Sequence, residues 1–301
     1  MEKSVISCDQ FTKKRLEELF QLADDINSNP KKYAKSLEGK IVATLFYEPS
    51  TRTRLSFESS TMKLGANVIS TENAREASSV VKGETLKDTI RIISGFADAI
   101  VIRHSDIDSA EVAASVSTVP VLNAGSGSGE HPTQALLDMY TIKSKKGELN
   151  NLKVAISGDL LNGRSVHSLI KLLSLYDNIT IYGLSRKFFE LPKKYVDVLA
   201  ERGVEYISCS EIEELPTDVD IIYHTRTQLE RLTDRSGIRI EEYIIDKKVM
   251  SRFSKTTYLM HPLPRVKEIS EDFDDDPRAI YFEQAHNGVR IRMALLYQAL
   301  K

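Results

Sequence analysis

The sequence predicts an α/β protein with two Rossmann-like domains, each a mainly parallel sheet with helices on both faces, linked by terminal and interdomain helices. Short β-prone runs alternate with amphipathic helical stretches along nearly the whole chain, which is the pattern of parallel sheets covered by helices. The chain has 301 residues, a length that suits two cores of ordinary size. Apolar stripes at helical spacing mark both ends of the chain.

The first half of the chain contains the elements of one sheet. Strand-like runs rich in aliphatic and β-branched residues lie at 41–47, 67–71, 99–104 and 119–124. Helical periodicity lies between or after them at 53–64, 85–96, 106–116 and 133–145. Because helices separate successive runs, we expect the strands to be parallel.

The second half repeats this organisation. Strand-like runs lie at 153–157, 179–183, 204–208, 221–224 and 258–261. We therefore expect one domain over 1–132 and a second over 133–287, divided where a helix starts after His131 and Pro132. An apolar stripe between Phe11 and Ile26 can pair with another between Ile291 and Ala299, so a C-terminal helix at 288–301 is expected to complete the first domain.

Composition excludes several classes of function. The 41 basic and 43 acidic residues nearly balance and form no basic stripe, which argues against a nucleic-acid partner. No run approaches the roughly 18 apolar residues of a membrane span. The N-terminus lacks the basic and apolar pattern of a secretory signal, so we expect a cytoplasmic protein. Cys8 and Cys209 are too few for a disulfide framework or a structural zinc site.

Ser50, Thr51, Arg52, Thr53 and Arg54 form the most informative segment. They follow a β-prone run that stops at a Glu-Pro pair, and they open a predicted helix. A helix N-terminus favours an anion through its unpaired N–H groups and its dipole. Hydroxyls and a guanidinium in the same turn add charge-assisted hydrogen bonds. The segment therefore predicts a phosphate site, in preference to a simple helix cap.

Other polar side chains follow the predicted strands at the end where open parallel sheets bind their ligands. They are Arg103, His104, His131, Arg164, Arg226, Gln228 and the segment from His261 to Arg265. A polar stretch at 70–85 has little hydrophobic period, carries Ser78 and Lys82, and is typical of a functional loop. The candidate site thus gathers cations without a carboxylate cluster, which favours small, multiply anionic substrates and disfavours a metal.

An NADP-dependent dehydrogenase is the alternative from another enzyme class. The segment from Gly158 to Ser165 has nearly P-loop spacing and opens a Rossmann-like half, and Ser185 with Arg186 could hold a 2′-phosphate. Its two glycines do not have the G-x-G-x-x-G spacing, and no acid follows the run at 219–223 to hold magnesium for a kinase.

Six motifs in order along the chain resemble the transcarbamylase family. They are Phe46 to Glu58 (FYEPSTRTRLSFE), Lys82 to Thr85 (KGET), Arg103-His104, His131 to Gln134 (HPTQ), Gly163 to Ser168 (GRSVHS) and His261 to Arg265 (HPLPR). The resemblance implies two domains, one for carbamoyl phosphate and one for the amino acid, and a reaction without metal or organic cofactor. The product would be a carbamoyl amino acid used in de novo pyrimidine biosynthesis.

The resemblance also implies the residues that bind carbamoyl phosphate. Ser50, Thr51, Arg52 and Thr53 would hold the phosphate, and Arg103 would bridge toward the carbonyl. Thr53, Arg103 and His131 would donate to the carbonyl oxygen, where negative charge develops. The carbamoyl amide would contact the residues Gln134, Pro262 and Leu263, the last two through backbone carbonyls. The peptide bond between Leu263 and Pro264 is expected to be cis, as in the family.

The amino acid implied by the resemblance is L-aspartate. Ornithine-using members have His-Cys-Leu-Pro where this chain has Pro262 after its histidine, and they lack the KGET loop. Aspartate would contact the residues Lys82, Arg164, Arg226, Gln228 and Leu263. Arginine suits a carboxylate because its guanidinium presents a planar fork of donors. Glu48 would pair with Arg164 and Arg231 when the domains close, and the 231–237 segment differs from the better-known bacterial form.

Assembly is a further implication of the resemblance. Ser78 and Lys82 match positions that reach the site of an adjacent subunit, which implies a homotrimer with shared sites. The sequence leaves open whether separate regulatory chains bind the trimer and make the enzyme allosteric. A non-catalytic binding protein with this fold is the second alternative, because fold alone does not establish function.

Overall fold

In the computed structural model, which describes residues 3–72, 83–227 and 242–301, the chain forms two compact units. The first contains 1–137 and 286–301, and the second contains 138–285. Helix α7 (Pro132–Lys146) and helix α11 (Tyr281–Leu300) each pass from one unit into the other.

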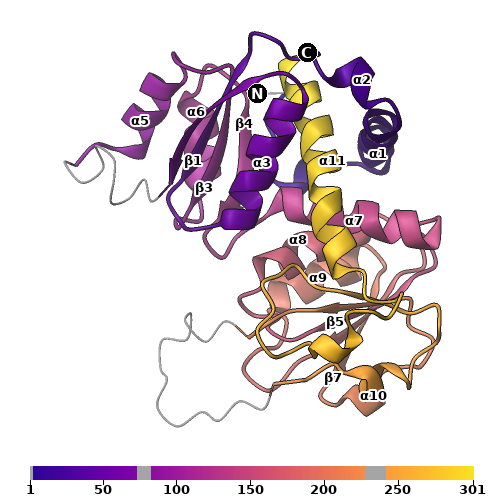
Figure 1. Cartoon of the computed structure of the whole chain (residues 1–301). Coiled ribbons are helices and arrows are strands. Elements are labelled where there is room, and N and C mark those ends of the chain that lie inside the picture. The colour runs from indigo at the N-terminus through magenta and orange to yellow at the C-terminus, as the bar shows by residue number, and fades with distance from the viewer. Residues whose placement is uncertain (1–2, 73–82, 228–241) are drawn as a thin grey trace. The chain divides into compact units, whose positions relative to one another are not determined.

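The first unit contains a parallel sheet in the order β2-β1-β3-β4. Its strands are β1 (Ile41–Phe46), β2 (Asn67–Glu72), β3 (Ala99–His104) and β4 (Val121–Ser126). Its other helices are α1 (Lys13–Ser28), α2 (Pro30–Tyr33), α3 (Thr51–Lys63), α5 (Leu86–Ile93) and α6 (Ser109–Val116), preceded by the 3-10 turn η1 (Cys8–Gln10). Helices α5 and α6 lie on one side of this sheet, and α3 lies on the other (Figure 1).

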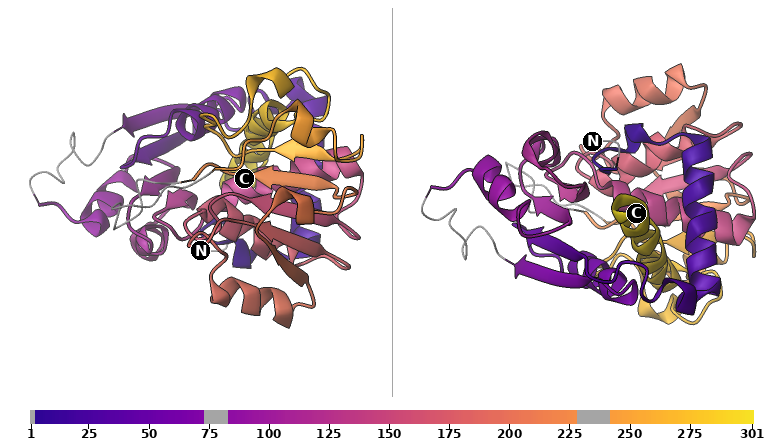
Figure 2. Two further views of the ribbon diagram at one scale, coloured as in Figure 1. Left: turned by 90° about the horizontal axis from the view of Figure 1, so that it is seen from below. Right: turned by 90° about the horizontal axis from the view of Figure 1, so that it is seen from above.

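The second unit contains a parallel sheet in the order β7-β6-β5-β8-β9. Its strands are β5 (Lys153–Ser157), β6 (Thr180–Leu184), β7 (Glu205–Cys209), β8 (Ile221–His224) and β9 (Tyr258–Met260). They lie side by side in the left view of Figure 2. The remaining elements are α8 (Arg164–Leu173), α9 (Lys193–Glu201), η3 (Ile212–Glu214), α10 (Lys247–Met250) and η5 (Glu271–Phe273). The predicted fold class, two parallel-sheet domains with helices on both faces, is confirmed.

The alternation of apolar residues along the strands determines which face of the sheet packs into the core. In the first unit Ala43, Leu45, Ile100 and Ile102 point to the face covered by α5 and α6, where Ile90 joins them. Burying such side chains contributes about 25 cal/mol for each Å² of apolar surface removed from water, so this pattern fixes which face each strand turns inward.

Strand β4 begins later than the sequence pattern predicts, and proline explains the shift. The predicted run starts at 119, whereas the strand starts at Val121. Pro120 has no N–H to donate, although its carbonyl accepts a hydrogen bond of 2.9 Å from Ile100 N. The strand then continues to Ser126, which extends it toward the candidate site.

The C-terminal helix packs within the first unit. Arg292 Nη1 donates to Ser56 Oγ at 2.8 Å, and Ser60 Oγ donates to the carbonyl of Val289 at 3.1 Å. The rings of Tyr33 and Tyr297 meet edge to face with centroids 5.2 Å apart. The second half of α11 is therefore held by α2 and α3. No helix in the described ranges combines the length and the apolar character that crossing a membrane requires.

Candidate active site

The N-terminus of α3 follows directly from the end of β1. Ser50 occupies the N-cap position, and its side chain makes no capping hydrogen bond. Thr51 and Arg52 are exposed, while Thr53 is buried in the first turn. The hydroxyl of Ser50 and the N–H groups of this turn are thus available to an anion. We call Ser50, Thr51, Arg52 and Thr53 the anion site.

The two arginines of this segment have different surroundings. Arg54 Nη2 lies 2.8 Å from Glu72 Oε2, and its Nη1 lies 3.7 Å from Glu58 Oε1. None of the carboxylates in the described ranges pairs with Arg52. Desolvation by the surrounding protein lowers the pKa of Arg52, although its side chain remains solvent-accessible. Arg54 therefore joins α3 to β2, whereas the exposed guanidinium of Arg52 has no carboxylate partner among the described residues.

Arg103 stands at the same edge of the first sheet. It lies opposite Phe46 in the β1–β3 register, and its carbonyl accepts a hydrogen bond of 2.8 Å from Tyr47 N. Arg103 Nε lies 3.6 Å from Glu48 Oε2. Glu48 is thus next to Arg103 within the first unit, whereas its predicted partner Arg164 belongs to the second unit.

His131 comes from the loop after β4 and starts α7. Its side chain is buried, and its carbonyl accepts a hydrogen bond of 3.0 Å from Gln134 N. Since β4 is the neighbour of β3, this loop ends at the same carboxyl edge of the sheet as Arg103 and the anion site. The topology therefore brings the anion site, Arg103 and His131 to one edge of the first sheet.

Two nearby titratable groups have structural partners instead. Glu130 accepts hydrogen bonds from Ser7 Oγ at 2.9 Å and from Cys8 N at 2.7 Å, so it holds the N-terminal segment. His104 Nδ1 accepts from Asp106 N at 3.0 Å. Both groups thus take part in local structure near His131.

The second unit contributes residues from three adjacent strands. Arg164 is the first residue of α8, which follows β5, and Arg226 lies two residues after the end of β8. Pro262 and Leu263 follow β9. Because β5, β8 and β9 are neighbours in the sheet, these residues share its carboxyl edge, and all four are partly exposed.

Residues 261–265, here called the carbonyl loop, are anchored from distant parts of the second unit. His261 N donates to Gln284 Oε1 at 2.9 Å, and Gln284 Nε2 donates to Asp138 Oδ1 at 2.7 Å. Tyr223 Oη donates to the other oxygen of Asp138 at 2.8 Å. Burial, followed by the charge of Asp138, raises the pKa of Tyr223, so the phenol stays protonated and donates. The loop contains a cis peptide bond between Leu263 and Pro264, as predicted.

Four predicted site residues lie outside the described residues: Ser78, Lys82, Gln228 and Arg231. The described part of the chain contains no group of three or more His, Cys, Asp or Glu side chains that could hold a metal ion.

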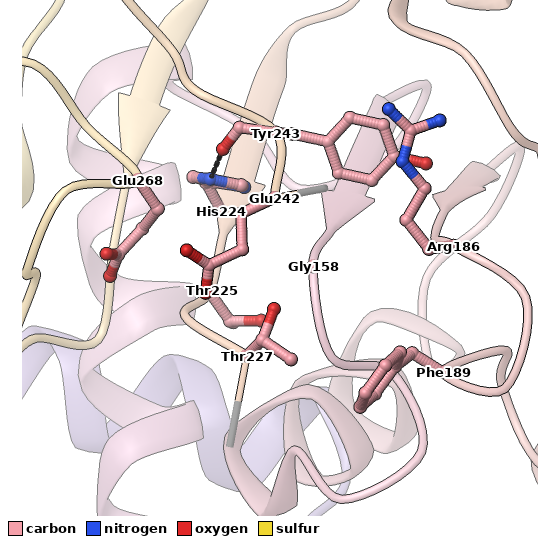
Figure 3. A pocket seen from close by; sticks show the side chains of 9 residues that line it. All are labelled: Gly158, Arg186, Phe189, His224, Thr225, Thr227, Glu242, Tyr243 and Glu268. Carbon is pink, nitrogen blue, oxygen red and sulfur yellow. Dashed lines mark hydrogen bonds between the residues drawn. The ribbon is translucent and has the colours of Figure 1, made fainter. Parts of the chain in front are cut away.

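The structure disfavours the dinucleotide alternative. At the switch point between β5 and β8, a side chain on Gly158 would lie 2.1 Å from the carbonyl of Thr225, so the two segments touch. A cavity of about 10 Å³, roughly the size of one water molecule, lies beside them (Figure 3). Arg186, the residue considered for a 2′-phosphate, lies 2.7 Å from Glu211 Oε1 and stacks 4.3 Å from the centroid of the Tyr243 ring.

The residues that support the carbonyl loop were not predicted from the sequence. Asp138, Gln284 and Glu268 are almost fully buried, and the first two lie far along the chain from the loop. No local pattern predicts hydrogen bonds over 23 or 146 positions. A polar residue at an apolar position of α11, such as Gln284, is the only signal that could have indicated one of them.

Comparison with protein families agrees with this arrangement. Residues 3–144 match the carbamoyl-P binding domain of aspartate/ornithine carbamoyltransferase, and residues 150–299 match its Asp/Orn binding domain.

Individual relatives cover the whole chain. The aspartate carbamoyltransferase catalytic subunit of Clostridium novyi is 47% identical over 300 residues, covering 99% of this chain and 98% of that protein. The chloroplastic aspartate carbamoyltransferase of Arabidopsis thaliana is 48% identical over 297 residues, covering 97% of this chain and 76% of that protein.

Solved structures agree in fold. The catalytic subunit of M. Jannaschii aspartate transcarbamoylase is 43% identical, with a TM-score of 0.90, covering 99% of this chain and 98% of that one. The Trypanosoma cruzi enzyme in complex with carbamoyl phosphate and aspartate is 37% identical, with a TM-score of 0.93, covering 100% and 97%. The chain belongs to the aspartate/ornithine carbamoyltransferase family.

Proposed function

We propose that this protein transfers the carbamoyl group of carbamoyl phosphate to the α-amine of L-aspartate, giving N-carbamoyl-L-aspartate and phosphate for pyrimidine biosynthesis. The observation that carries the proposal is the 47% identity, over 99% of the chain, to an aspartate carbamoyltransferase catalytic subunit. Pro262 supports aspartate over ornithine, because ornithine-using members have cysteine at this position.

The phosphate half of the reaction rests on the anion site. Ser50, Thr51 and Thr53 bring hydroxyl groups and N–H groups to a helix N-terminus, and Arg52 adds a guanidinium that no described carboxylate neutralises. A phosphate there gains the helix dipole as well as charge-assisted hydrogen bonds. These interactions hold the leaving group before and after it departs.

The chemical step is an attack of the amine nitrogen on the carbamoyl carbon. A tetrahedral intermediate forms, and the carbonyl oxygen gains negative charge. Thr53, Arg103 and His131 donate to this oxygen, and a neutral imidazole can do so from one nitrogen. The bond from carbon to the phosphate oxygen then breaks. The departing phosphate accepts the proton that the amine releases, so no side chain is needed as the base.

The amino-acid half rests on the second unit. Arg164 and Arg226 each offer a guanidinium to a carboxylate of aspartate, with Gln228 and Lys82 as further contacts. Gln134 and the carbonyls of Pro262 and Leu263 hold the carbamoyl amide. Orientation of the two substrates supplies much of the acceleration, since effective molarities in well-oriented reactions are very high.

The assembly proposed is a homotrimer in which Ser78 and Lys82 enter the site of the adjacent subunit. We further propose a cytoplasmic enzyme that can associate with separate regulatory chains.

Mixing an inactive Arg52→Ala chain with an inactive Lys82→Ala chain tests whether adjacent subunits share the site. If the sites are shared, mixed trimers regain activity, because some sites receive both intact halves. Activity that never returns would contradict the shared site.

Turnover is the first experiment. The purified chain is incubated with carbamoyl phosphate and either L-aspartate or L-ornithine, without added metal, and carbamoyl amino acid is measured. The proposal predicts product with aspartate alone. Product with ornithine would contradict the roles of Arg226 and Lys82. Binding of carbamoyl phosphate without turnover would favour the non-catalytic binding protein.

A further inference from the structure

The carbonyl loop adopts a backbone conformation that its own sequence does not favour. Leu263 has φ = 53°, in the left-handed region that non-glycine residues rarely occupy. Such a conformation is unfavourable for a residue with a side chain, and it persists only where surrounding groups hold it. Neighbouring side chains must therefore hold Leu263 in this conformation, which sets the directions of its carbonyl and that of Pro262.

The imidazole of His261 makes the closest contact. Its Nδ1 accepts a hydrogen bond of 2.8 Å from Leu263 N. An imidazole nitrogen that accepts from a backbone N–H carries no proton, so the proton of the neutral ring is on Nε2. Nε2 lies 3.0 Å from Glu268 Oε1 and donates to it. The side chains of His261 and Glu268 are 1% and 3% exposed.

Glu268 uses both carboxylate oxygens. Oε1 accepts from His261, and Oε2 accepts from Val266 N at 2.9 Å and from Lys267 N at 3.0 Å. Every one of these three groups is a donor. A carboxylate meets all of them, whereas an amide of the same shape would turn its NH₂ group toward at least one donor. The site therefore requires the charged residue and not merely its volume.

His224 packs against the pair formed by His261 and Glu268. Its ring centroid lies 6.2 Å from that of His261, and its Nε2 lies 3.2 Å from the carbonyl of Tyr243. His224 and Glu268 line the same small cavity in Figure 3. This packing leaves the imidazole of His261 between a histidine ring and a carboxylate, which limits its rotation.

We propose that Glu268 is a positioning residue for carbamoyl transfer: through His261 it fixes the Leu263 N–H and hence the directions of the Pro262 and Leu263 carbonyls. Glu268 itself does not touch the substrates. This inference rests on the proposed function, which assigns those two carbonyls to the carbamoyl amide.

The test is a double-mutant cycle with Glu268→Gln and His261→Asn. The Asn side chain can accept the N–H of the second residue after it in an Asx turn, so His261→Asn retains the Leu263 contact without Glu268. We expect Glu268→Gln to lower kcat/KM for carbamoyl phosphate roughly 10- to 100-fold, since misplacement of about 1 Å has effects of this size. His261→Asn should lose less than about fivefold, and the double variant should resemble His261→Asn.

Two readouts separate positioning from a general loss of structure. Inorganic phosphate, which needs only the anion site of the first unit, should inhibit wild type and Glu268→Gln equally. Glu213→Gln is the matched control, because this exposed carboxylate pairs with Arg252 at 3.1 Å on the surface. Full activity of Glu268→Gln, or a loss that persists undiminished in the His261→Asn background, would overturn the proposal.

A spectroscopic readout keeps the inference distinct from the proposed function. The imidazole ¹⁵N shifts of His261, assigned by their absence in His261→Asn, should report a proton on Nε2 and none on Nδ1 in the wild type. Glu268→Gln should change that pattern. A wild type that does not carbamoylate aspartate would refute the proposed function, whereas an unchanged ¹⁵N pattern in Glu268→Gln would refute the positioning role.

Discussion

The anion site and the carbonyl loop are built in opposite ways. The anion site uses four consecutive residues on one helix N-terminus, so backbone geometry alone brings its groups together. The carbonyl loop depends on Glu268, on Gln284 from α11 and on Asp138 from α7. A change in the anion site should remove a contact with substrate, while a change around the loop should act through geometry and stability. The predictions below test that contrast.

The largest effect is expected from Arg52→Ala. Removal of the guanidinium eliminates charge-assisted hydrogen bonds to phosphate, each of which contributes about 1.5–3 kcal/mol. We expect kcat/KM for carbamoyl phosphate to fall about a thousandfold and inhibition by inorganic phosphate to weaken strongly, with the unfolding midpoint unchanged. Arg252→Ala, at an exposed ion pair, is the matched control. A loss below tenfold would show that phosphate binds elsewhere.

His131→Ala should act on the chemical step and not on phosphate binding. This residue donates to the carbonyl oxygen in the proposed mechanism, and loss of one such donor lowers kcat by about 100- to 1000-fold. Inhibition by inorganic phosphate should stay within about twofold of wild type. Steady-state kinetics with both substrates varied measures the two quantities. Equal weakening of phosphate binding in this variant and in Arg52→Ala would show that His131 also binds the phosphate, and would contradict a role limited to the carbonyl oxygen.

Features made of consecutive residues could be predicted from the sequence, whereas contacts between residues far apart in the chain could not. All nine strands of the described residues were predicted within two residues of their observed starts, because apolar runs and turn residues encode them. The anion site was predicted because its residues are consecutive. The support of the carbonyl loop was not, since Gln284 and Asp138 meet it only after two helices have packed. The φ of Leu263 is likewise imposed by tertiary contacts and has no sequence signal.

Gln284→Leu should reduce stability where the anion-site variants do not. The substitution leaves the N–H of His261 and one oxygen of Asp138 without their partner in a buried region. Each such group costs about 1–3 kcal/mol, so we expect the free energy of unfolding to fall by about 2–4 kcal/mol. Urea titration measures it. Gln298→Leu, at an exposed position of the same helix, is the control and should change it by less than about 0.5 kcal/mol.

His224 gives the smallest effect and the only one that depends on pH. Burial lowers the pKa of His224 to about 4; repulsion from the His261 ring, which acts only when both imidazoles are protonated, works in the same direction, and the charge of Glu268 opposes the shift. Between pH 6.5 and pH 4 the unfolded chain binds a proton that the folded protein does not, so stability falls as the pH decreases through this window. One residue with these pKa values loses about 2 kcal/mol between pH 7 and pH 5.

His224→Gln should remove that dependence, because glutamine does not titrate and its amide can still donate to the carbonyl of Tyr243. The difference in unfolding free energy between pH 7 and pH 5 should therefore be about 2 kcal/mol smaller in the variant. Glu268 does not obscure the comparison. Burial alone would raise its pKa, but the hydrogen bonds from His261 and Val266 N lower it to about 2, so its contribution is lost only as the pH falls from about 4.5 toward 2. Identical pH dependence in wild type and variant would mean that folding does not lower the pKa of His224, and that the packing around the carbonyl loop accommodates a protonated imidazole at this position.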